Sequence, residues 1–223
     1  MKNKMTKEPQ YGEMLEMNRV TMGILSGHAF LTDPKRVSFV ASRYKFISKM
    51  FLGFEKVLEV GCADGFYATI VKQAVKKFVA TDFEPIFIDD ARKTHPFAAE
   101  MEFLEHDMVL GPLSEKFDGI FSLDVLEHIS KKDEDSFMKN VLSSLSNDGA
   151  CIIGMPSLES QVYASEISKK GHVNCKTGEE LRSFLKNYFA NVFLFSMNDE
   201  IIHTGYLPMS QYLLALCTNP RLP

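Results

Sequence analysis

Val57-Leu-Glu-Val-Gly-Cys-Ala-Asp-Gly65 is the stretch that decides the fold of this 223-residue chain. Three of its first four residues are apolar, with Glu59 as the exception, and this apolar run predicts a buried strand. Gly61 and Gly65 bracket a turn, because glycine adopts positive φ and lets a ligand approach the backbone. The helix expected after the turn leaves its first amides free. In an open parallel sheet, ligands bind beside such turns at the carboxyl ends of strands.

Strand and helix patterns alternate around this stretch, which predicts an α/β fold with a doubly wound parallel sheet. Two later strand patterns joined by a loop predict an antiparallel hairpin on the sheet edge. The expected strands are 57–60, 78–81, 101–105, 117–122, 150–155, 189–197 and 211–217. The expected helices are one from Pro34, capped by Asp33 and ended by Gly53, then 67–75, 84–93, 131–145 and 177–187, the last opened by the capping box Thr177-Gly-Glu-Glu180.

Composition excludes several classes of protein. Hydrophobic residues make up 45% and charged residues 24%, as in ordinary globular proteins. A net charge of −4 argues against a broad basic surface for nucleic acid. The charged N-terminus lacks the apolar core of a signal peptide, and no apolar run is long enough for a membrane span, so we expect a cytoplasmic protein without membrane contact. The four cysteines lack metal-ligand spacing, and no metal is expected.

The glycine turn does not suit a dinucleotide. A nicotinamide-binding turn needs Gly-x-Gly-x-x-Gly, but this chain has Ala63 at the middle position, and Asp64 would repel a pyrophosphate. This argues against an oxidoreductase. Two carboxylates, Glu59 and Asp64, instead favour a ligand with a cationic centre and an amino group.

The next two strand ends add polar and aromatic side chains. Asp82 ends the second strand, where a carboxylate accepts hydrogen bonds from a ribose, and Phe83 can lie against an adenine face. Asp107 ends the third strand and can accept from an adenine amino group, with Met108 beside it. For Asp82 the competing interpretation is a cap for the following helix. The ordered set on three strand ends is more specific than any one residue.

With these residues the chain resembles the class I S-adenosylmethionine-dependent methyltransferases, well over residues 40–155 and in outline elsewhere. The matching stretches are the opening turn, Ala80-Thr-Asp-Phe-Glu-Pro85, Leu104-Glu-His-Asp-Met108, Phe117-Asp-Gly-Ile-Phe-Ser-Leu-Asp-Val-Leu-Glu-His128 and Leu142-x-x-Leu-x-x-x-Gly149. The resemblance implies a Rossmann-like, seven-stranded sheet, mostly parallel with an antiparallel edge strand, an N-terminal helical lid, and S-adenosyl-L-methionine as cofactor. It also implies that Leu123 lies under the sulfonium. Residues and resemblance together give an expected cofactor site of Glu59, Gly61, Cys62, Ala63, Asp64, Gly65, Asp82, Phe83, Asp107, Met108 and Leu123.

The acceptor side is less legible. We expect a tail and lid over 1–34 and one methyltransferase domain over 35–223, with cofactor elements at about 55–155 and acceptor elements at about 157–210. Methylation of an oxygen needs a base, and histidine is the commonest. His128 follows the fourth strand and His172 lies in the irregular stretch after the fifth, and a packing role is the alternative for both.

The expected activity is methyl transfer to a small polar acceptor, for example an oxygen of a sugar or sugar nucleotide. Methylation of a quinone-like phenol, and a cofactor-binding protein without catalysis, stay open as alternatives, as does a homodimer.

Overall fold

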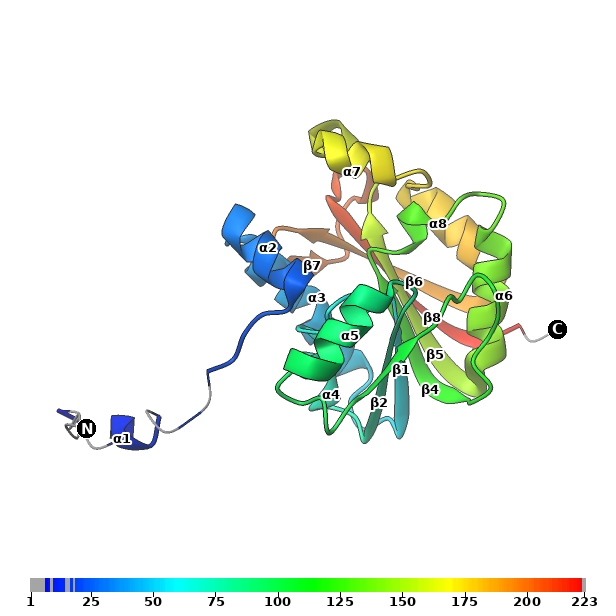
Figure 1. Cartoon of the computed structure of the whole chain (residues 1–223). Helices are drawn as coiled ribbons and strands as arrows, with labels where there is room; N and C mark the ends of the chain where they lie inside the picture. The colour runs from blue at the N-terminus through cyan, green and yellow to red at the C-terminus, as the bar shows by residue number, and fades with distance from the viewer. Residues whose placement is uncertain (1–6, 9, 15–16, 18, 222–223) are drawn as a thin grey trace.

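The computed structural model describes residues 7–8, 10–14, 17 and 19–221. Most of the predicted N-terminal tail therefore lies outside the described residues. Helices cover both faces of one mixed sheet, whose strand order is β3-β2-β1-β4-β5-β8-β6-β7 (Figure 1). The strands are β1 (Lys56–Val60), β2 (Lys77–Asp82), β3 (Glu102–Glu105), β4 (Phe117–Leu123), β5 (Leu145–Pro156), β6 (Phe189–Asn198), β7 (Ile201–His203) and β8 (Tyr212–Pro220).

Four of the five predicted helices are shorter than the sequence patterns predict, and α5 has the predicted length. The α-helices are α1 (Gln10–Met14), α2 (Ile24–Thr32), α3 (Arg36–Met50), α4 (Ala68–Lys72), α5 (Pro85–Thr94), α6 (Glu134–Ser144), α7 (Glu166–Gly171) and α8 (Gly178–Leu185). Three 3-10 helices are η1 (Leu126–His128), η2 (Glu159–Tyr163) and η3 (Leu207–Met209). No helix in these parts of the chain is long and apolar enough to cross a membrane.

Strands β1 to β5 are mutually parallel, and the order reverses between β1 and β4. Ligands bind in such sheets at this reversal, beyond the carboxyl ends of the strands. Strand β8 runs antiparallel to both β5 and β6. The predicted antiparallel pairing of the late strands at the sheet edge is confirmed, with β8 next to β5 and with β6 and β7 outside it.

The sheet of the described residues has eight strands, one more than the predicted seven. Strand β7 lies in the stretch expected as a loop, and three residues are too few to carry an alternating pattern. Strand β5 begins at Leu145 and not at the predicted residue 150, and its register against β4 shifts between Leu145 and Ala150.

Two helix starts test the capping predictions. Asp33 was expected to cap the helix after it, but it ends α2, and α3 begins at Arg36 with Lys35 as N-cap. The Asp33 side chain accepts a weak hydrogen bond from the Lys35 amide at 3.3 Å. The capping box of α8 is confirmed.

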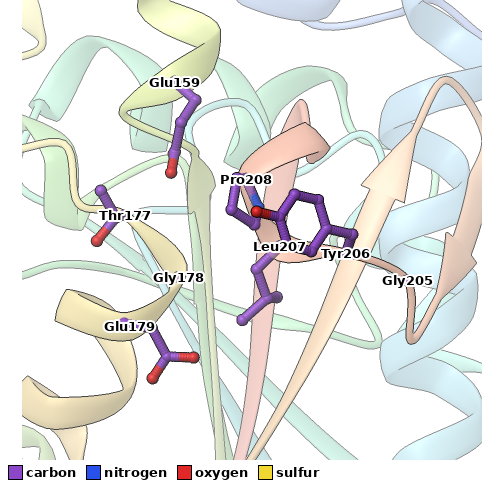
Figure 2. A pocket seen from close by; sticks show the side chains of 8 residues that line it. All are labelled: Glu159, Thr177, Gly178, Glu179, Gly205, Tyr206, Leu207 and Pro208. Atoms are coloured by element: carbon purple, nitrogen blue, oxygen red, sulfur yellow. The ribbon is translucent and has the colours of Figure 1, made fainter.

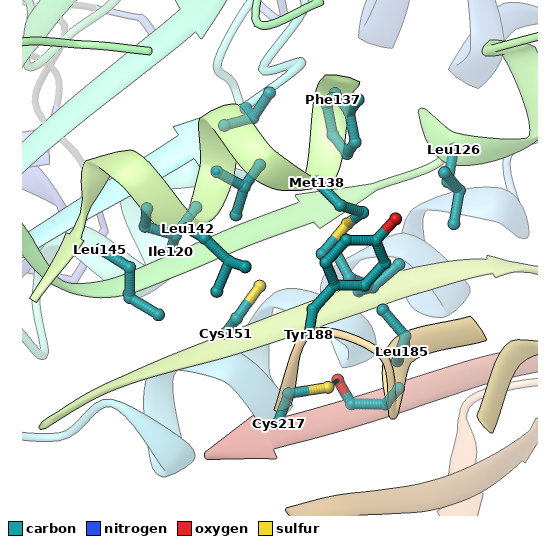
Figure 3. Packing of buried hydrophobic residues seen from close by; sticks show 14 of the residues in the cluster. Ile120, Leu126, Phe137, Met138, Leu142, Leu145, Cys151, Leu185, Tyr188 and Cys217 are labelled. Carbon is teal, nitrogen blue, oxygen red and sulfur yellow. Dashed lines mark hydrogen bonds between the residues drawn. The ribbon is translucent and has the colours of Figure 1, made fainter. Parts of the chain in front are cut away.

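Two apolar clusters hold the helices to the sheet. One joins α3, α4 and α5 to the sheet and the other joins α6 and α8 to its opposite face. Figure 3 shows the second cluster, in which Phe137, Met138 and Leu142 point from α6 towards β4 and β5. Cys151 and Cys217 are reduced packing residues in this cluster, as expected for such buried thiols.

Candidate cofactor and acceptor site

The glycine turn follows β1 at the point where the strand order reverses. Gly61 and Gly65 adopt φ values of 82° and 68°, and Ala63 adopts 48°. The Gly61 amide donates to the Thr81 carbonyl at 2.7 Å, which ties the turn to β2. Glycine is also required by packing, since a Cβ on Gly61 would lie 2.2 Å from a methyl group of Val125. Ala63 thus occupies a left-handed conformation that glycine adopts without strain.

Glu59 lies completely buried under this turn. Its Oε1 accepts a hydrogen bond from the Tyr44 hydroxyl at 2.5 Å. Its Oε2 has no hydrogen-bond partner among the described residues. Burial raises the pKa of Glu59 to about 8, the Tyr44 hydrogen bond opposes this rise, and the neighbouring Asp82 and Asp64 carboxylates add to it. Among the described residues, the charged groups that shift this pKa are therefore both carboxylates.

The buried carboxylate of Asp64 makes its hydrogen bonds within the protein. Its carboxylate accepts from the Ser26 amide at 2.7 Å, from the Ser26 hydroxyl at 2.8 Å and from the Phe66 amide at 3.2 Å. The N-terminal turn of α2 is thereby fixed to the glycine turn, which agrees with a covering role for this helix. Sequence reasoning missed Ser26, since nothing local to it indicates a partner so far along the chain.

Asp82 braces the turn from the end of β2. One carboxylate oxygen accepts from the Ala63 amide at 2.8 Å and the other from the Glu84 amide at 3.0 Å. The competing interpretation of Asp82 as the helix cap is wrong, because Glu84 is the N-cap of α5 and no described side chain caps this helix. Phe83 follows Asp82 at the carboxyl end of β2 and has 63% of its surface exposed.

Of the other predicted cofactor residues, Cys62, Met108 and Leu123 are buried and Asp107 is half-buried. Asp107 accepts from the Val109 amide at 2.8 Å. The side chains of Met108 and Leu123 are buried in the two apolar clusters, and Cys62 is buried as well, which raises the pKa of its thiol. What these four offer a ligand is mainly backbone and one carboxylate.

A second group of side chains lies around η1, beyond the end of β4. The rings of His128 and His172 stand edge to face with centroids 5.0 Å apart. Nδ1 of His128 lies 3.0 Å from the Gly171 carbonyl, and Nδ1 of His172 lies 2.7 Å from Oε1 of Gln161. Sequence reasoning named the two histidines as separate candidates, and the structure brings them together.

Glu127 is the residue that sequence reasoning missed here. It is 1% exposed, its Oε2 has no partner among the described residues, and its Oε1 lies 4.0 Å from Nε2 of His128. Burial raises its pKa well above the usual range, and the nearby carboxylate of Asp124 adds to this rise. Its signal was the Leu-Glu-His sequence of the family resemblance, which drew attention to the histidine alone.

Arg43 connects this group to the N-terminal helices. Its guanidinium donates to the Asp124 carboxylate at 2.7 Å and lies 3.6 Å from the centroid of the Tyr212 ring. Asp124 has a φ of 56°, which turns the chain sharply at the end of β4. The charge pair and the stacked ring join α3, β4 and β8 at the carboxyl edge.

Two hollows open within the stretch predicted for the acceptor side. One of about 330 Å³ is bordered by His172 and Gln161, with the charged side chains Lys131, Lys169 and Glu180. The other, of about 410 Å³, lies between the start of α8 and the segment before β8 (Figure 2). Figure 2 shows Glu159 and Tyr206 on opposite sides of it.

Comparison with known proteins agrees with this architecture. Residues 57–149 match a family model described as a methyltransferase domain. This match runs from β1 into β5 and covers less than half of the chain, and over these residues the chain is similar to methyltransferase domains. A malonyl-[acyl-carrier protein] O-methyltransferase of Calditerrivibrio nitroreducens is 27% identical over 136 residues, which are 61% of this chain and 52% of that protein. The chain thus spans about half the length of this curated relative.

Two solved structures show the same fold. The N-methyltransferase NodS from Bradyrhizobium japonicum, in complex with S-adenosyl-L-homocysteine, superposes with a TM-score of 0.62 at 19% identity, covering 82% of this chain and 86% of its own. A TehB-like methyltransferase from Corynebacterium glutamicum gives a TM-score of 0.63 at 18% identity, covering 86% and 97%. At such identities the likeness concerns the fold.

Proposed function

We propose that this protein transfers the methyl group of S-adenosyl-L-methionine to an oxygen of a small polar acceptor, such as a sugar or a sugar nucleotide. The observation that carries the proposal is the buried carboxylate of Glu59 beneath the glycine turn. It has one oxygen without a partner among the described residues. A cationic ligand beside it would satisfy this oxygen and offset the cost of burying a carboxylate.

The surrounding residues fit the other parts of the cofactor. Phe83 presents an exposed ring at the end of β2 for an adenine to lie against. Asp107 lies at the end of the next strand, where its second oxygen could accept from an amino group. Asp82 fixes the turn through the Ala63 amide and can face a ribose with the same carboxylate.

The chemistry requires orientation more than activation. S-adenosyl-L-methionine supplies, when bound, an electrophilic methyl group on a positively charged sulfur. The protein then has to align the acceptor oxygen with this methyl group and exclude water. A base must accept the hydroxyl proton of the acceptor. His128 and His172 are the candidates, because the hydrogen bonds described above use the Nδ1 atom of each ring and leave its Nε2 atom for the proton.

The polarity of the acceptor is inferred from the hollow beside His172. Its charged rim of two lysines and a glutamate suits a hydroxylated or phosphorylated acceptor better than a flat phenol. The curated relative is named for a malonyl-carrier acceptor and NodS for a nitrogen acceptor, so relatives with this fold do not decide the acceptor. A quinone-like phenol and a non-catalytic cofactor binder stay as the alternatives.

The cofactor half of the proposal is tested by calorimetry with S-adenosyl-L-homocysteine. Wild type should bind it, and Phe83→Ala should bind it about 5- to 150-fold more weakly, since stacking on an aromatic ring contributes about 1 to 3 kcal/mol. Phe193→Ala is the matched control, because Phe193 is a similarly exposed phenylalanine on β6. Absence of binding by wild type would refute the cofactor assignment.

The acceptor half is tested by following S-adenosyl-L-homocysteine release with nucleoside-diphosphate sugars and with catechols. Turnover with the sugars and none with the catechols supports the proposal. The reverse result selects the phenol alternative. Cofactor binding without turnover on either acceptor class would contradict the proposed activity and favour the non-catalytic binder.

A further inference from the structure

The side chains of Glu127, His128 and His172 converge at the carboxyl edge of the sheet. Each offers one ligand atom, and these three atoms all lie within 4.8 Å of one another. They come from two segments, since η1 carries the first two and the residue that ends α7 carries the third. The Asn174 amide donates to the Glu127 carbonyl at 3.0 Å, which holds the two segments together. We propose that these three side chains bind one divalent first-row transition cation.

The histidines are oriented as metal ligands. Both Nδ1 atoms lie against oxygens that can only accept, the Gly171 carbonyl for His128 and Oε1 of Gln161 for His172. Each Nδ1 must therefore carry the proton, which leaves the lone pair on Nε2. Such a hydrogen bond from the second ring nitrogen to a carbonyl or carboxylate is the usual support of a metal-bound histidine.

The support of His172 is itself fixed. Gln161 donates from its amide nitrogen to the Ser157 carbonyl at 3.2 Å, so its oxygen faces the histidine. Ser157 is fully buried, and its hydroxyl donates to the Ser210 carbonyl. The ring of His172 is thus held by a chain of contacts that starts in the interior.

Glu127 supplies the charge that a cation needs. Its side chain is 1% exposed and turned towards the histidines, with Oε1 4.0 Å from Nε2 of His128. Its Oε2 is buried and has no partner among the described residues. A buried carboxylate oxygen with no donor is costly unless a cation or a proton neutralises it. The positive charge of Arg43 acts on this carboxylate, but the Arg43 guanidinium is hydrogen-bonded to Asp124.

The geometry requires a modest contraction. Around an ion with bonds of about 2.1 Å, tetrahedral ligand atoms lie about 3.4 Å apart. The present separations of up to 4.8 Å must therefore close by about 1.4 Å at most. His128 has 48% of its side chain exposed, so its ring has room to move towards the other two.

The donor set narrows the kind of ion. Two imidazoles and one carboxylate suit zinc, iron(II), manganese(II) or cobalt(II), whereas calcium and magnesium prefer oxygen ligands throughout. Three protein ligands leave at least one position open for a solvent or substrate oxygen. The hollow of about 330 Å³ shares His172 with this site. A role in holding the acceptor oxygen rests on the proposed methyl transfer, whereas the existence of the site does not.

The two proposed roles of the histidines, as base and as metal ligand, use the Nε2 atom differently. A base needs the lone pair for a proton, and a ligand needs it for the ion. With the ion bound, neither histidine is a free base, and the pair positions the acceptor instead.

The test is a titration of tag-free, chelator-stripped protein with Co²⁺, followed by visible absorption. Wild type should bind one ion per chain. His172→Ala and Glu127→Gln should bind it at least tenfold more weakly. Gln161→Leu changes no ligand and should weaken binding about 10- to 100-fold, as the loss of a supporting hydrogen bond does. His106→Ala is the matched control, because His106 is a partly buried histidine bonded to the Gly111 carbonyl after β3.

Circular dichroism melts establish that each variant is folded. If His172→Ala does not fold, the isosteric Glu127→Gln and the supporting Gln161→Leu decide the question. No Co²⁺ binding by wild type, or equal affinity in the site variants and His106→Ala, overturns the metal site. Binding of S-adenosyl-L-homocysteine is measured on the same samples. Cofactor binding without Co²⁺ binding refutes the metal site alone, and the opposite result refutes the cofactor assignment alone.

Discussion

Raising the pH should destabilise the folded protein through Glu59. Its pKa is about 8 in the folded protein because of burial, against an ordinary value of 4.5. An acid with a raised pKa binds its proton more tightly in the folded protein than in the unfolded chain. Unfolding between these two pKa values therefore releases a proton, and raising the pH favours unfolding. The favourable effect is complete below about pH 4.5 and is lost as the pH rises to about 8. The two pKa values correspond to at most about 5 kcal/mol, of which about 3 kcal/mol is lost by pH 7.

The assay is urea unfolding at pH 5, 7 and 9 without ligand, comparing wild type with Glu59→Gln. The glutamine keeps an acceptor for the Tyr44 hydroxyl but places an amide where Oε2 has no partner. Relative to the protonated Glu59 side chain, this substitution costs about 1 to 3 kcal/mol at every pH. Wild type should therefore be the more stable protein at pH 5, and the difference should vanish or reverse at pH 9.

Other buried acids contribute to the overall slope, so the comparison of two proteins matters more than either curve. The pKa of Glu127 is also raised by burial, and its effect is the same in both. Glu102→Gln is a control, since Glu102 is exposed on β3 and the substitution should leave the slope unchanged. A stability difference between wild type and Glu59→Gln that stays constant within about 0.5 kcal/mol from pH 5 to pH 9 refutes the reasoning, because a change of about 4 kcal/mol is expected.

The parallel half of the fold was predictable because each of its strands carries its own signal. Buried parallel strands are continuous apolar runs, and β1, β2 and β4 end at a glycine turn or an aspartate. The pairing of β8 was not predictable, because the choice between β5 and β6 as first neighbour depends on the chain's path in space. Strand β7 is stabilised by its partner in β6 rather than by its three residues.

The cofactor side was legible in residue type but not in the use of each residue. Asp64 and Asp82 were predicted as ligand contacts, and their carboxylates hold the Ser26 and Ala63 amides of the protein itself. An aspartate after a strand looks the same in sequence whether it faces a ligand or a backbone amide. For Asp64, the position of α2, which lies far away in the chain, shows that the carboxylate binds a backbone amide.

The acceptor side shows the limit most clearly. His128 and His172 were each visible as residues that could bind a proton, but a metal site depends on how several ligands converge. That convergence is made by the amide of Asn174 and the side chain of Gln161, neither of which has a distinctive sequence context.

Two further substitutions test the turn and its cover. Gly61→Ala should lower the free energy of unfolding by about 2 to 4 kcal/mol, from left-handed strain and the overlap with a valine methyl, while Gly111→Ala, with open space around it, should not; equal denaturation midpoints would contradict this. Ser26→Ala should release α2, because its hydroxyl donates to the buried Asp64 carboxylate. Loss of a hydrogen bond to a charged group costs about 2 kcal/mol. Since proteolysis follows the population of the open state, trypsin should cleave between α2 and α3 roughly 30-fold faster. Ser38→Ala removes a surface hydroxyl contact on α3 and should leave this rate unchanged, so equal rates in the two variants would show that the Asp64 contact does not hold α2 in place.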